Sequence, residues 1–438
     1  METEYDKHIE SVTKSVKQAL TETGYDTLVI HSGTPTLYYA DDQEIPFRSL
    51  PYFRWFAPLN SPHHVVIIST KDAKPLVIEC MPDDYWIEHD TAVSAWRESF
   101  THISVKTPIA VWAMMKEHAN GRRSFIGDTT SSQEAKKNSI AEDAINPEAL
   151  IRALNDERSI KTQYEIDCLT QANEIAAKGH LTARDAFLSG ASEFEIHLAY
   201  LAATLSSEGG LPYPTITALN EKSSTLHYQH KRVDVKNGNT FLLDAGVNHR
   251  GYASDVTRTY ASDSANPMFK SLLMDVINLQ KKLTELVKPA VQYIELHHKA
   301  HLGIAEILKR HGIATTDGEK SIERGITGAF FPHGLGHMLG LQVHDVGGVD
   351  PFAETHPLRA FYPKVRTNRT LVEGNVTTIE PGLYFIPMLL KPLHESDSRN
   401  MLNWQLIDEL TPMGGIRIED NLVVTESGMK NLTREFLL

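Results

Sequence analysis

A short polar segment, residues 155–161, places the strongest constraint on how this chain can fold. It reads Asn-Asp-Glu-Arg-Ser-Ile-Lys and separates two parts of the sequence that have different patterns. Short apolar runs dominate before it, whereas long helical patterns beside β-like runs follow it. A chain of 438 residues also exceeds the size of one ordinary core. We therefore predict two domains, residues 1–160 and 161–438.

The first part mixes helices and strands. An amphipathic pattern predicts a helix over residues 6–24 that ends at Gly24. Apolar runs bounded by turn residues predict strands over 27–31, 64–69 and 75–79. This order is typical of an α/β domain.

The second part predicts an α+β domain. Helical patterns cover about residues 162–189, 192–206, 267–286 and 293–311. Between them lie β-like runs at 240–244, 252–260, 375–380 and 415–425. Helices grouped beside antiparallel strands are the arrangement that this order favours.

The composition limits the possible partners and compartments. The chain has 43 basic and 56 acidic residues, a net charge of −13, so its surface repels phosphate backbones and no nucleic-acid partner is expected. Two cysteines, Cys80 and Cys168, cannot build a disulfide framework or a thiolate metal site, which fits a reducing compartment. The first residues lack a signal-peptide pattern, and no apolar run reaches the length of a membrane span. We expect a cytoplasmic protein with no membrane partner.

Two aspartates lie in a predicted β-hairpin. If His249 and Arg250 form its two-residue turn, Asp244 and Asp255 stand directly opposite each other. Opposed like charges repel, so the pair needs a compensating cation. Alternatively, one aspartate caps a helix and the other lies in a turn.

Two glutamates also stand at the ends of β-like runs. Glu380 closes the run Val-Thr-Thr-Ile and precedes a Pro-Gly break, so it is either a solvated strand end or a ligand facing a cleft. In the run 415–425, a period of two places Arg417, Glu419 and Asn421 on one face. Such a face indicates either a polar cavity or a surface strand.

A histidine-rich segment, residues 331–345, contains His333, His337 and His344 among several glycines. Glycine lets a backbone pass close to a bound group. Three histidines within twelve residues exceed what core packing requires, so we interpret His337 as a ligand and the other two as groups that orient substrate or pass protons.

Four carboxylates and one imidazole form a coherent ligand set. Oxygen-rich ligation suits manganese, cobalt or magnesium, with zinc possible. Two ions roughly 3.5–4 Å apart can share a bridging hydroxide and polarise a carbonyl or phosphoryl oxygen. The set therefore indicates hydrolysis of amides or esters. Its members are Asp244, Asp255, His337, Glu380 and Glu419.

The motifs around these residues resemble those of the bacterial Xaa-Pro dipeptidases (prolidases), which belong to the pita-bread metallopeptidase family. The resemblance extends over nearly the whole chain. Organophosphorus acid anhydrolases, themselves prolidases, look equally similar. The matching blocks are His31-Ser-Gly, Asp41-Asp-Gln-Glu-Ile-Pro-Phe, Ala218-Leu-Asn-Glu, Leu226-His-Tyr, Leu243-Asp-Ala-Gly, His333-Gly-Leu-Gly-His, Leu341-Gln-Val-His-Asp, Ile379-Glu-Pro-Gly and Gly415-Ile-Arg-Ile-Glu-Asp-Asn.

The resemblance implies a pita-bread catalytic domain that holds two divalent ions, most readily Mn²⁺, with Co²⁺ or Zn²⁺ possible. Asp244 is expected to bind one ion, Asp255 and Glu419 to bridge both, and His337 and Glu380 to complete the other. Residues implied in catalysis are Glu380, His333, His344 and Arg417. Residues implied in substrate binding are Asp42, Tyr213, His227, Tyr293, Val343, His344 and Arg417.

The same resemblance implies a homodimer. Asp42, in the N-terminal domain, is expected to reach a neighbouring subunit's active site and meet the free amine of the substrate. Thr257 matches a residue that supports Asp255. Residues 387–404 are predicted to form a variable loop at the pocket rim.

Three readings of function remain open. The first is a dimetal dipeptidase for Xaa-Pro substrates with promiscuous hydrolysis of organophosphorus triesters. The second keeps the fold but changes the main substrate to phosphotriesters, creatine-like compounds or the longer peptides of aminopeptidase P. The third is a metal-free binding module of the same fold, which the retention of all five ligand positions disfavours.

Overall fold

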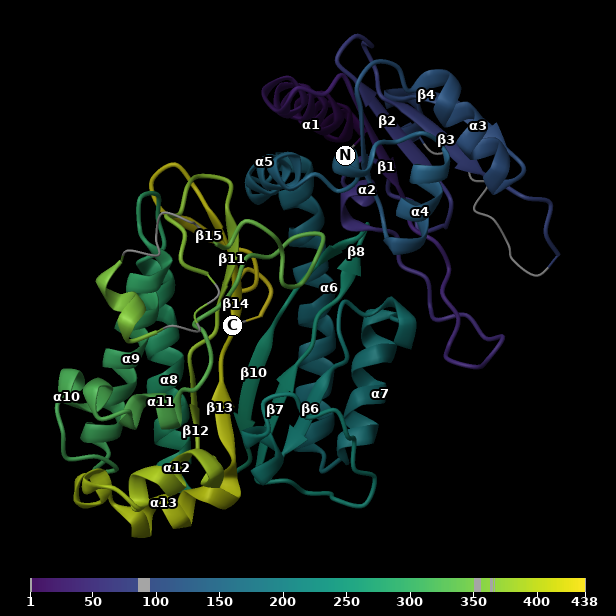
Figure 1. The fold of residues 1–438 in the computed structure, drawn as a ribbon. Coiled ribbons are helices and arrows are strands. Elements are labelled where there is room, and N and C mark those ends of the chain that lie inside the picture. The colour runs from purple at the N-terminus through teal and green to yellow at the C-terminus, as the bar shows by residue number, and fades with distance from the viewer. Residues whose placement is uncertain (1, 86–94, 350–355, 363–364, 366, 438) are drawn as a thin grey trace. The chain divides into compact units, whose positions relative to one another are not determined.

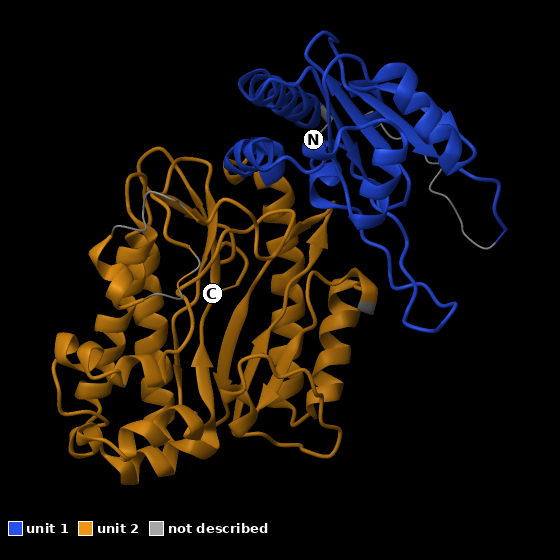
Figure 2. Cartoon of the chain, in the orientation of Figure 1, with its two compact units in different colours: residues 1–158, 162–165 blue, residues 159–161, 166–438 orange. Residues whose placement is uncertain are grey.

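The computed structural model describes residues 2–85, 95–349, 356–362, 365 and 367–437. The chain forms two compact units, residues 1–158 with 162–165 and residues 159–161 with 166–438 (Figure 2). No helix in the described part of the chain is both long and apolar enough to cross a membrane.

Unit 1 contains a five-stranded mixed sheet with the order β4-β3-β2-β1-β5. β1 pairs antiparallel with β2 and parallel with β5, and β3 pairs parallel with β4. The strands are β1 Thr27–His31, β2 Val65–Ser69, β3 Leu76–Cys80, β4 Thr101–Val105 and β5 Arg123–Ile126. The helices are α1 Glu2–Thr23, α2 Pro51–Phe56, α3 Pro108–His118, α4 Thr129–Lys137 and α5 Glu148–Ser159.

The local sequence explains these elements. α1 ends where Gly24 takes a φ of +75°, a conformation that glycine adopts at little cost. β1 and β2 are buried along their whole length, which matches the run of apolar residues in each strand. The predicted α/β character of the N-terminal part is confirmed.

Unit 2 carries two groups of helices and several short sheets (Figure 1). The sheets have the orders β10-β7-β6, β11-β14-β15, β12-β13 and β8-β9. The strands are β6 Ile216–Leu219, β7 Thr240–Asp244, β8 Asn248–His249, β9 Tyr252–Ala253, β10 Thr257–Ala261, β11 Val376–Ile379, β12 Gly382–Tyr384, β13 Gly415–Arg417, β14 Asp420–Val424 and β15 Met429–Asn431. The helices are α6 Gln163–Leu188, α7 Glu193–Thr204, α8 Pro267–Glu285, α9 Tyr293–Arg310, α10 Gly318–Glu323, α11 Ile326–Phe330, α12 Pro387–His394 and α13 Trp404–Leu410.

The strands of unit 2 lie between two helical layers (Figure 1). On one side, Phe187 of α6 and Tyr200 of α7 share a core cluster with Phe241 of β7. On the other side, residues of α8 and α9 share a larger cluster with Ile379 of β11 and Leu422 of β14. Burial of these faces fixes the strands, and the strand ends then present the polar residues.

The hairpin register differs from the prediction by two residues. Asp244 pairs with Thr257, and His249 pairs with Tyr252, so the turn residues are Arg250 and Gly251. Both turn residues have positive φ, +51° and +91°, as a type I′ turn requires. The prediction that Asp244 and Asp255 directly oppose each other is therefore wrong.

The prediction of a loop over residues 387–404 is also wrong. This segment contains α12, a 3₁₀ helix at Asp397–Met401 and the start of α13. Leu390, Leu393 and Leu402 are buried in the larger core cluster, which explains why the segment is helical. None of its residues lines the pocket formed by the described part of unit 2.

Candidate metal centre

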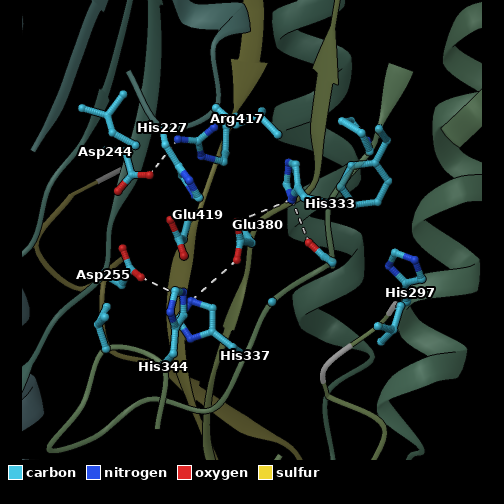
Figure 3. Close-up of a pocket in the computed structure, with 18 of the residues that line it drawn as sticks. His227, Asp244, Asp255, His297, His333, His337, His344, Glu380, Arg417 and Glu419 are labelled. Carbon is cyan, nitrogen blue, oxygen red and sulfur yellow. Dashed lines mark hydrogen bonds and ion pairs between the residues drawn. The ribbon is translucent and has the colours of Figure 1, made fainter. Parts of the chain in front are cut away.

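A pocket of about 680 Å³ lies within unit 2 and collects most of the predicted site residues (Figure 3). This volume is within the range of small-molecule sites. The predicted residues that line it are Tyr213, His227, Asp244, Asp255, His333, His337, Val343, His344, Glu380, Arg417 and Glu419.

Strand ends deliver the four carboxylates. Asp244 is the last residue of β7, and Glu380 directly follows β11. Asp255 lies between β9 and β10, and Glu419 lies between β13 and β14. Asp244 is thus the last residue of its strand, the other three lie just outside the strands, and all four face one pocket (Figure 3).

Backbone contacts lock two of these carboxylates in place. Glu419 N donates to the carbonyl of Thr257 at 3.0 Å, and Thr257 Oγ1 donates to Glu419 Oε2 at 2.7 Å. The backbone N–H of Asp255 donates to Asn421 Oδ1 at 3.0 Å, and the amide of Asn421 donates back to the carbonyl of Asp255. Thr257 thus orients Glu419, whereas Asn421 holds the backbone of Asp255.

His337 presents one ring nitrogen to the carboxylates. Its Nδ1 lies 3.0 Å from the carbonyl of Met338, so Nδ1 carries the proton and Nε2 is left with its lone pair when the ring is neutral. Nε2 lies 3.3 Å from Asp255 Oδ2 and 3.7 Å from Glu380 Oε1. This orientation is the one that a ligating imidazole needs.

A glycine allows the histidine segment to approach β11. Thr378 N donates to the carbonyl of His337 at 2.9 Å, and His337 N donates to Thr378 Oγ1 at 3.1 Å. A Cβ on Gly336 would lie 2.3 Å from the carbonyl oxygen of Thr378, so no larger residue fits.

Burial, followed by the neighbouring charges, shifts the pKa values of the cluster. Burial first, and then the neighbouring carboxylates, raise the pKa of Asp255 and raise that of Glu419 well above its usual range. Burial raises the pKa of Glu380 to about 7. Burial alone would lower the pKa of His337, but its hydrogen bond and charge interaction with Asp255 raise it to about 9.

These residues fit divalent cations. One ligand atom from each of Asp255, His337 and Glu419 lies within 4.8 Å of the others, close enough to share an ion. Asp244 and Glu380 line the same pocket, which brings all five predicted ligands together. Four carboxylates that share one nearby guanidinium, Arg417, keep an excess of negative charge that hard cations would offset.

Arg417 and Tyr213 form hydrogen bonds with the two aspartates of the cluster. Arg417 Nη2 donates to Asp244 Oδ2 at 2.7 Å, and its Nη1 donates to the hydroxyl of Tyr384 at 2.8 Å. The hydroxyl of Tyr213 lies 2.8 Å from Asp244 Oδ1 and 2.5 Å from Asp255 Oδ1. Asp244 is therefore held by both residues, whereas Asp255 is held by Tyr213.

The outer histidines surround this centre. His333 Nδ1 lies 3.7 Å from Glu380 Oε2, and burial lowers the pKa of His333 to about 3, so the ring is neutral. The rings of His337 and His344 meet edge to face with centroids 4.3 Å apart. His227 is exposed in the pocket, near Asp244 and Arg417 (Figure 3).

Two predicted substrate residues lie elsewhere. Tyr293 does not line the pocket among the described residues: it is fully buried, and its hydroxyl donates to the carbonyl of Thr378 at 2.6 Å. That part of the prediction is wrong, because the Tyr293 hydroxyl is hydrogen-bonded to the backbone of β11 and does not line the pocket. Asp42 belongs to unit 1 and is exposed.

Sequence reasoning missed three residues at this site. Tyr384 contacts both Arg417 and His333, the latter at 2.8 Å, but it follows Pro-Gly in an apolar run that gives no sign of a polar role. His297 and His301 line the pocket from α9, where their Nε2 atoms lie 3.2 Å apart. Their spacing of four residues on a predicted helix could have indicated this pair.

Two family models match the chain. The model described as metallopeptidase family M24 matches residues 167–426. The model described as the N-terminal domain of Xaa-Pro dipeptidase matches residues 3–155.

Curated relatives match over nearly their whole length. A Marinobacter nauticus protein named Xaa-Pro dipeptidase is 42% identical over 432 residues, which cover 98% of this chain and 97% of that protein. A Shewanella woodyi protein with the same name is 38% identical over 449 residues, which cover 98% of each.

Solved structures share the fold. Proline aminopeptidase P II from Yersinia pestis matches with a TM-score of 0.76 at 23% identity and covers 100% of this chain and 97% of its own. Escherichia coli aminopeptidase P with the inhibitor Pro-Leu matches with a TM-score of 0.76 at 24% identity, covering 98% and 95%. At this level of identity the likeness shows the fold alone.

Proposed function

This chain belongs to metallopeptidase family M24, and we propose that it is a Xaa-Pro dipeptidase that uses two divalent metal ions, with Mn²⁺ as the native metal. The family resemblance drawn from the sequence motifs is confirmed by the family matches and by the relatives that match over their full length. The dipeptide substrate is proposed because those relatives carry that name.

One observation carries the proposal: four buried or half-buried carboxylates and the Nε2 atom of His337 converge in one pocket. Bound there, divalent ions supply Lewis acidity toward a scissile carbonyl and lower the pKa of a coordinated, bridging water. Asp244, Asp255, His337, Glu380 and Glu419 are the residues that would hold them. A metal-free binding module of the same fold would have no use for this set.

The surrounding side chains suit a small substrate with a free carboxylate. Glu380 lies between His333 and His337, each at 3.7 Å, where a carboxylate can take a proton and the neutral His333 can help return it. His227, His344 and Arg417 are the candidates to hold the substrate carboxylate and the tetrahedral intermediate. Tyr213 and Val343 complete the wall near the metal ligands.

The same centre can act on phosphotriesters, since polarising a phosphoryl oxygen requires the same Lewis acid. We propose this as a promiscuous activity and Xaa-Pro hydrolysis as the main one. The test is to compare kcat/KM of the manganese-loaded protein for Ala-Pro and for a neutral phosphotriester. A higher kcat/KM for the triester would make organophosphorus hydrolysis the main activity.

Assembly and location complete the proposal. We propose a cytoplasmic homodimer, in which Asp42 of each chain meets the substrate's amine in the active site of the other. The two cysteines, Cys80 and Cys168, are both buried, and so small a number is in keeping with a reducing compartment. The domain division of the proposal, residues 1–160 and 161–438, assigns the dimer contact to the N-terminal part.

A further inference from the structure

Three neighbouring pocket residues, Leu226, His227 and Gln229, come from the segment that joins β6 to β7. Over residues 220–239 this segment forms only a short 3₁₀ helix, Asn220–Ser224. A segment with so little regular structure needs other contacts to hold a side chain in a fixed place.

Tyr228 supplies the first of these contacts. It stands between the two exposed residues His227 and Gln229 but is itself only 6% exposed. Its ring packs in a small core cluster with Ile216 and Ala218 of β6 and Leu242 of β7. The segment is therefore anchored to β6 and β7 directly beside His227.

The hydroxyl of Tyr228 donates a hydrogen bond of 2.9 Å to the fully buried carboxylate of Glu193. Glu193 is the first residue of α7, and it also accepts a hydrogen bond from the backbone N–H of Leu219 at 2.9 Å. Arg232 donates three more, from its backbone N–H at 2.8 Å, Nε at 3.1 Å and Nη2 at 2.7 Å. One side chain thus binds β6 and two residues that follow His227, Tyr228 and Arg232.

The charge on Glu193 matters for this arrangement. Burial alone would raise its pKa, but the hydrogen bonds from Arg232 and from the backbone hold that pKa below its usual value. A carboxylate accepts all five bonds, whereas a neutral amide in its place would turn an NH₂ group toward donors. Arg232 also donates to the exposed Glu221 at 2.9 Å, which is a separate contact on the solvent side.

We propose that Glu193 is a positioning residue for substrate recognition: through Tyr228 and Arg232 it fixes the segment that presents His227 to the dipeptide. This inference rests on the proposed function, in which His227 contacts the substrate. None of the proposed metal ligands contacts Glu193 or Tyr228 in the described hydrogen bonds. The hydrogen bonds of Glu193 therefore affect substrate affinity and not metal binding.

A double-mutant cycle tests the proposal. Tyr228→Phe removes only the hydroxyl and keeps the ring in its core, and His227→Ala removes the group that it positions. KM and kcat for Ala-Pro are measured on the metal-loaded protein for both single variants and the double variant, with metal content determined on the same samples. Glu221→Gln is the matched control, because it removes the exposed partner of Arg232 and leaves Glu193 intact.

The expected result is a rise in KM of about fivefold for Tyr228→Phe, with kcat and metal content unchanged. In the His227→Ala background the same substitution should add nothing, because the positioned group is gone. Glu193→Gln should act like Tyr228→Phe but more strongly, and Glu221→Gln should leave KM unaltered.

Two outcomes would overturn the inference. Effects of Tyr228→Phe and His227→Ala on KM that multiply independently would show that Tyr228 does not act through His227. A His227→Ala variant with the KM of the wild type would leave nothing to position. A wild-type protein that is loaded with metal but does not cleave Ala-Pro would instead contradict the proposed function itself, so the two failures are distinguishable.

Discussion

Arg417 Nη2 lies 2.7 Å from Asp244 Oδ2, and both residues are buried at the base of the pocket. The guanidinium also donates to Tyr384 and, from Nε at 3.3 Å, to Thr257. Three of its five N–H donors are therefore used within the protein, and two remain for a substrate carboxylate. Arg417 has two separable tasks: it holds a predicted metal ligand and it can bind the end of the dipeptide.

Replacing Arg417 should reveal both tasks. Arg417→Ala is expected to lower metal content, because Asp244 loses a charge-assisted partner, and to depress kcat/KM for Ala-Pro by at least about 100-fold. The loss for Ala-Pro amide, which has no carboxylate, should be smaller. Arg417→Lys should rescue only part of the activity because the planar fork is lost. Equal losses on the acid and the amide would restrict Arg417 to holding Asp244.

Asp255 should be indispensable for turnover and for metal binding. Asp255→Asn keeps the shape of the side chain but removes a charge that two dications require, so turnover should fall by about two orders of magnitude or more, together with metal occupancy. Asp263→Asn, which neutralises an exposed aspartate nearby in sequence, is the control and should behave like the wild type. Normal turnover of Asp255→Asn with both ions bound would mean that another carboxylate bridges them.

Much of this site could be predicted because its residues are tied to strand ends and turns. The run 240–244 ends in an aspartate, and the run 376–379 is followed by Glu-Pro-Gly, so the positions of Asp244 and Glu380 follow from short-range patterns. The four long helices of unit 2, α6, α7, α8 and α9, were predicted to within a few residues for a similar reason. A long amphipathic pattern bounded by capping residues, such as the Ser192–Glu195 capping box, strongly favours a helix with those bounds.

The errors come from features that local patterns do not encode. The hairpin register depends on Arg250 adopting a φ of +51°, which is rare for a residue other than glycine and gives no sequence signal. The packing of α9 and β12 decides where two tyrosine hydroxyls point: that of Tyr384 contacts the pocket residues His333 and Arg417, whereas that of Tyr293 contacts the carbonyl of Thr378. The helices at 387–410 form because their leucines pack into the core of unit 2. This is a tertiary contact, which the local sequence pattern does not reveal.

The predicted dimer concerns the N-terminal unit. Asp42 is exposed there, and its backbone N–H is held by the side chain of Asp41 at 2.8 Å. We expect sedimentation to show a dimer at assay concentration and Asp42→Ala to raise KM for Xaa-Pro dipeptides with metal content unchanged. Asp72→Ala, at another exposed position of the same unit, should have no effect. An active monomer would remove both the dimer and the role of Asp42.

Acid should weaken the contribution of Glu193 to folding. Its pKa is lowered in the folded protein, so its stabilising effect is present above the unfolded-state pKa of 4.5 and is lost as the pH falls through the lower folded value. The difference in Tm between the wild type and Glu193→Gln should therefore be greatest at neutral pH and shrink below about pH 4.5. Chelator in all samples removes the pH dependence of metal binding. A Tm difference that stays constant from pH 7 to acid would show that the charge of Glu193 is not involved.

The most direct test of a dimetal Xaa-Pro dipeptidase is hydrolysis by the protein before and after exhaustive chelation, followed by reconstitution with Mn²⁺ or Co²⁺. Ala-Pro and Leu-Pro are assayed beside a Xaa-Pro-Yaa tripeptide. We predict that chelation abolishes cleavage of both dipeptides, that either metal restores it, and that the tripeptide is a poor substrate throughout. Full activity of the metal-free protein would contradict the metal centre, and efficient cleavage of the tripeptide would contradict the dipeptidase.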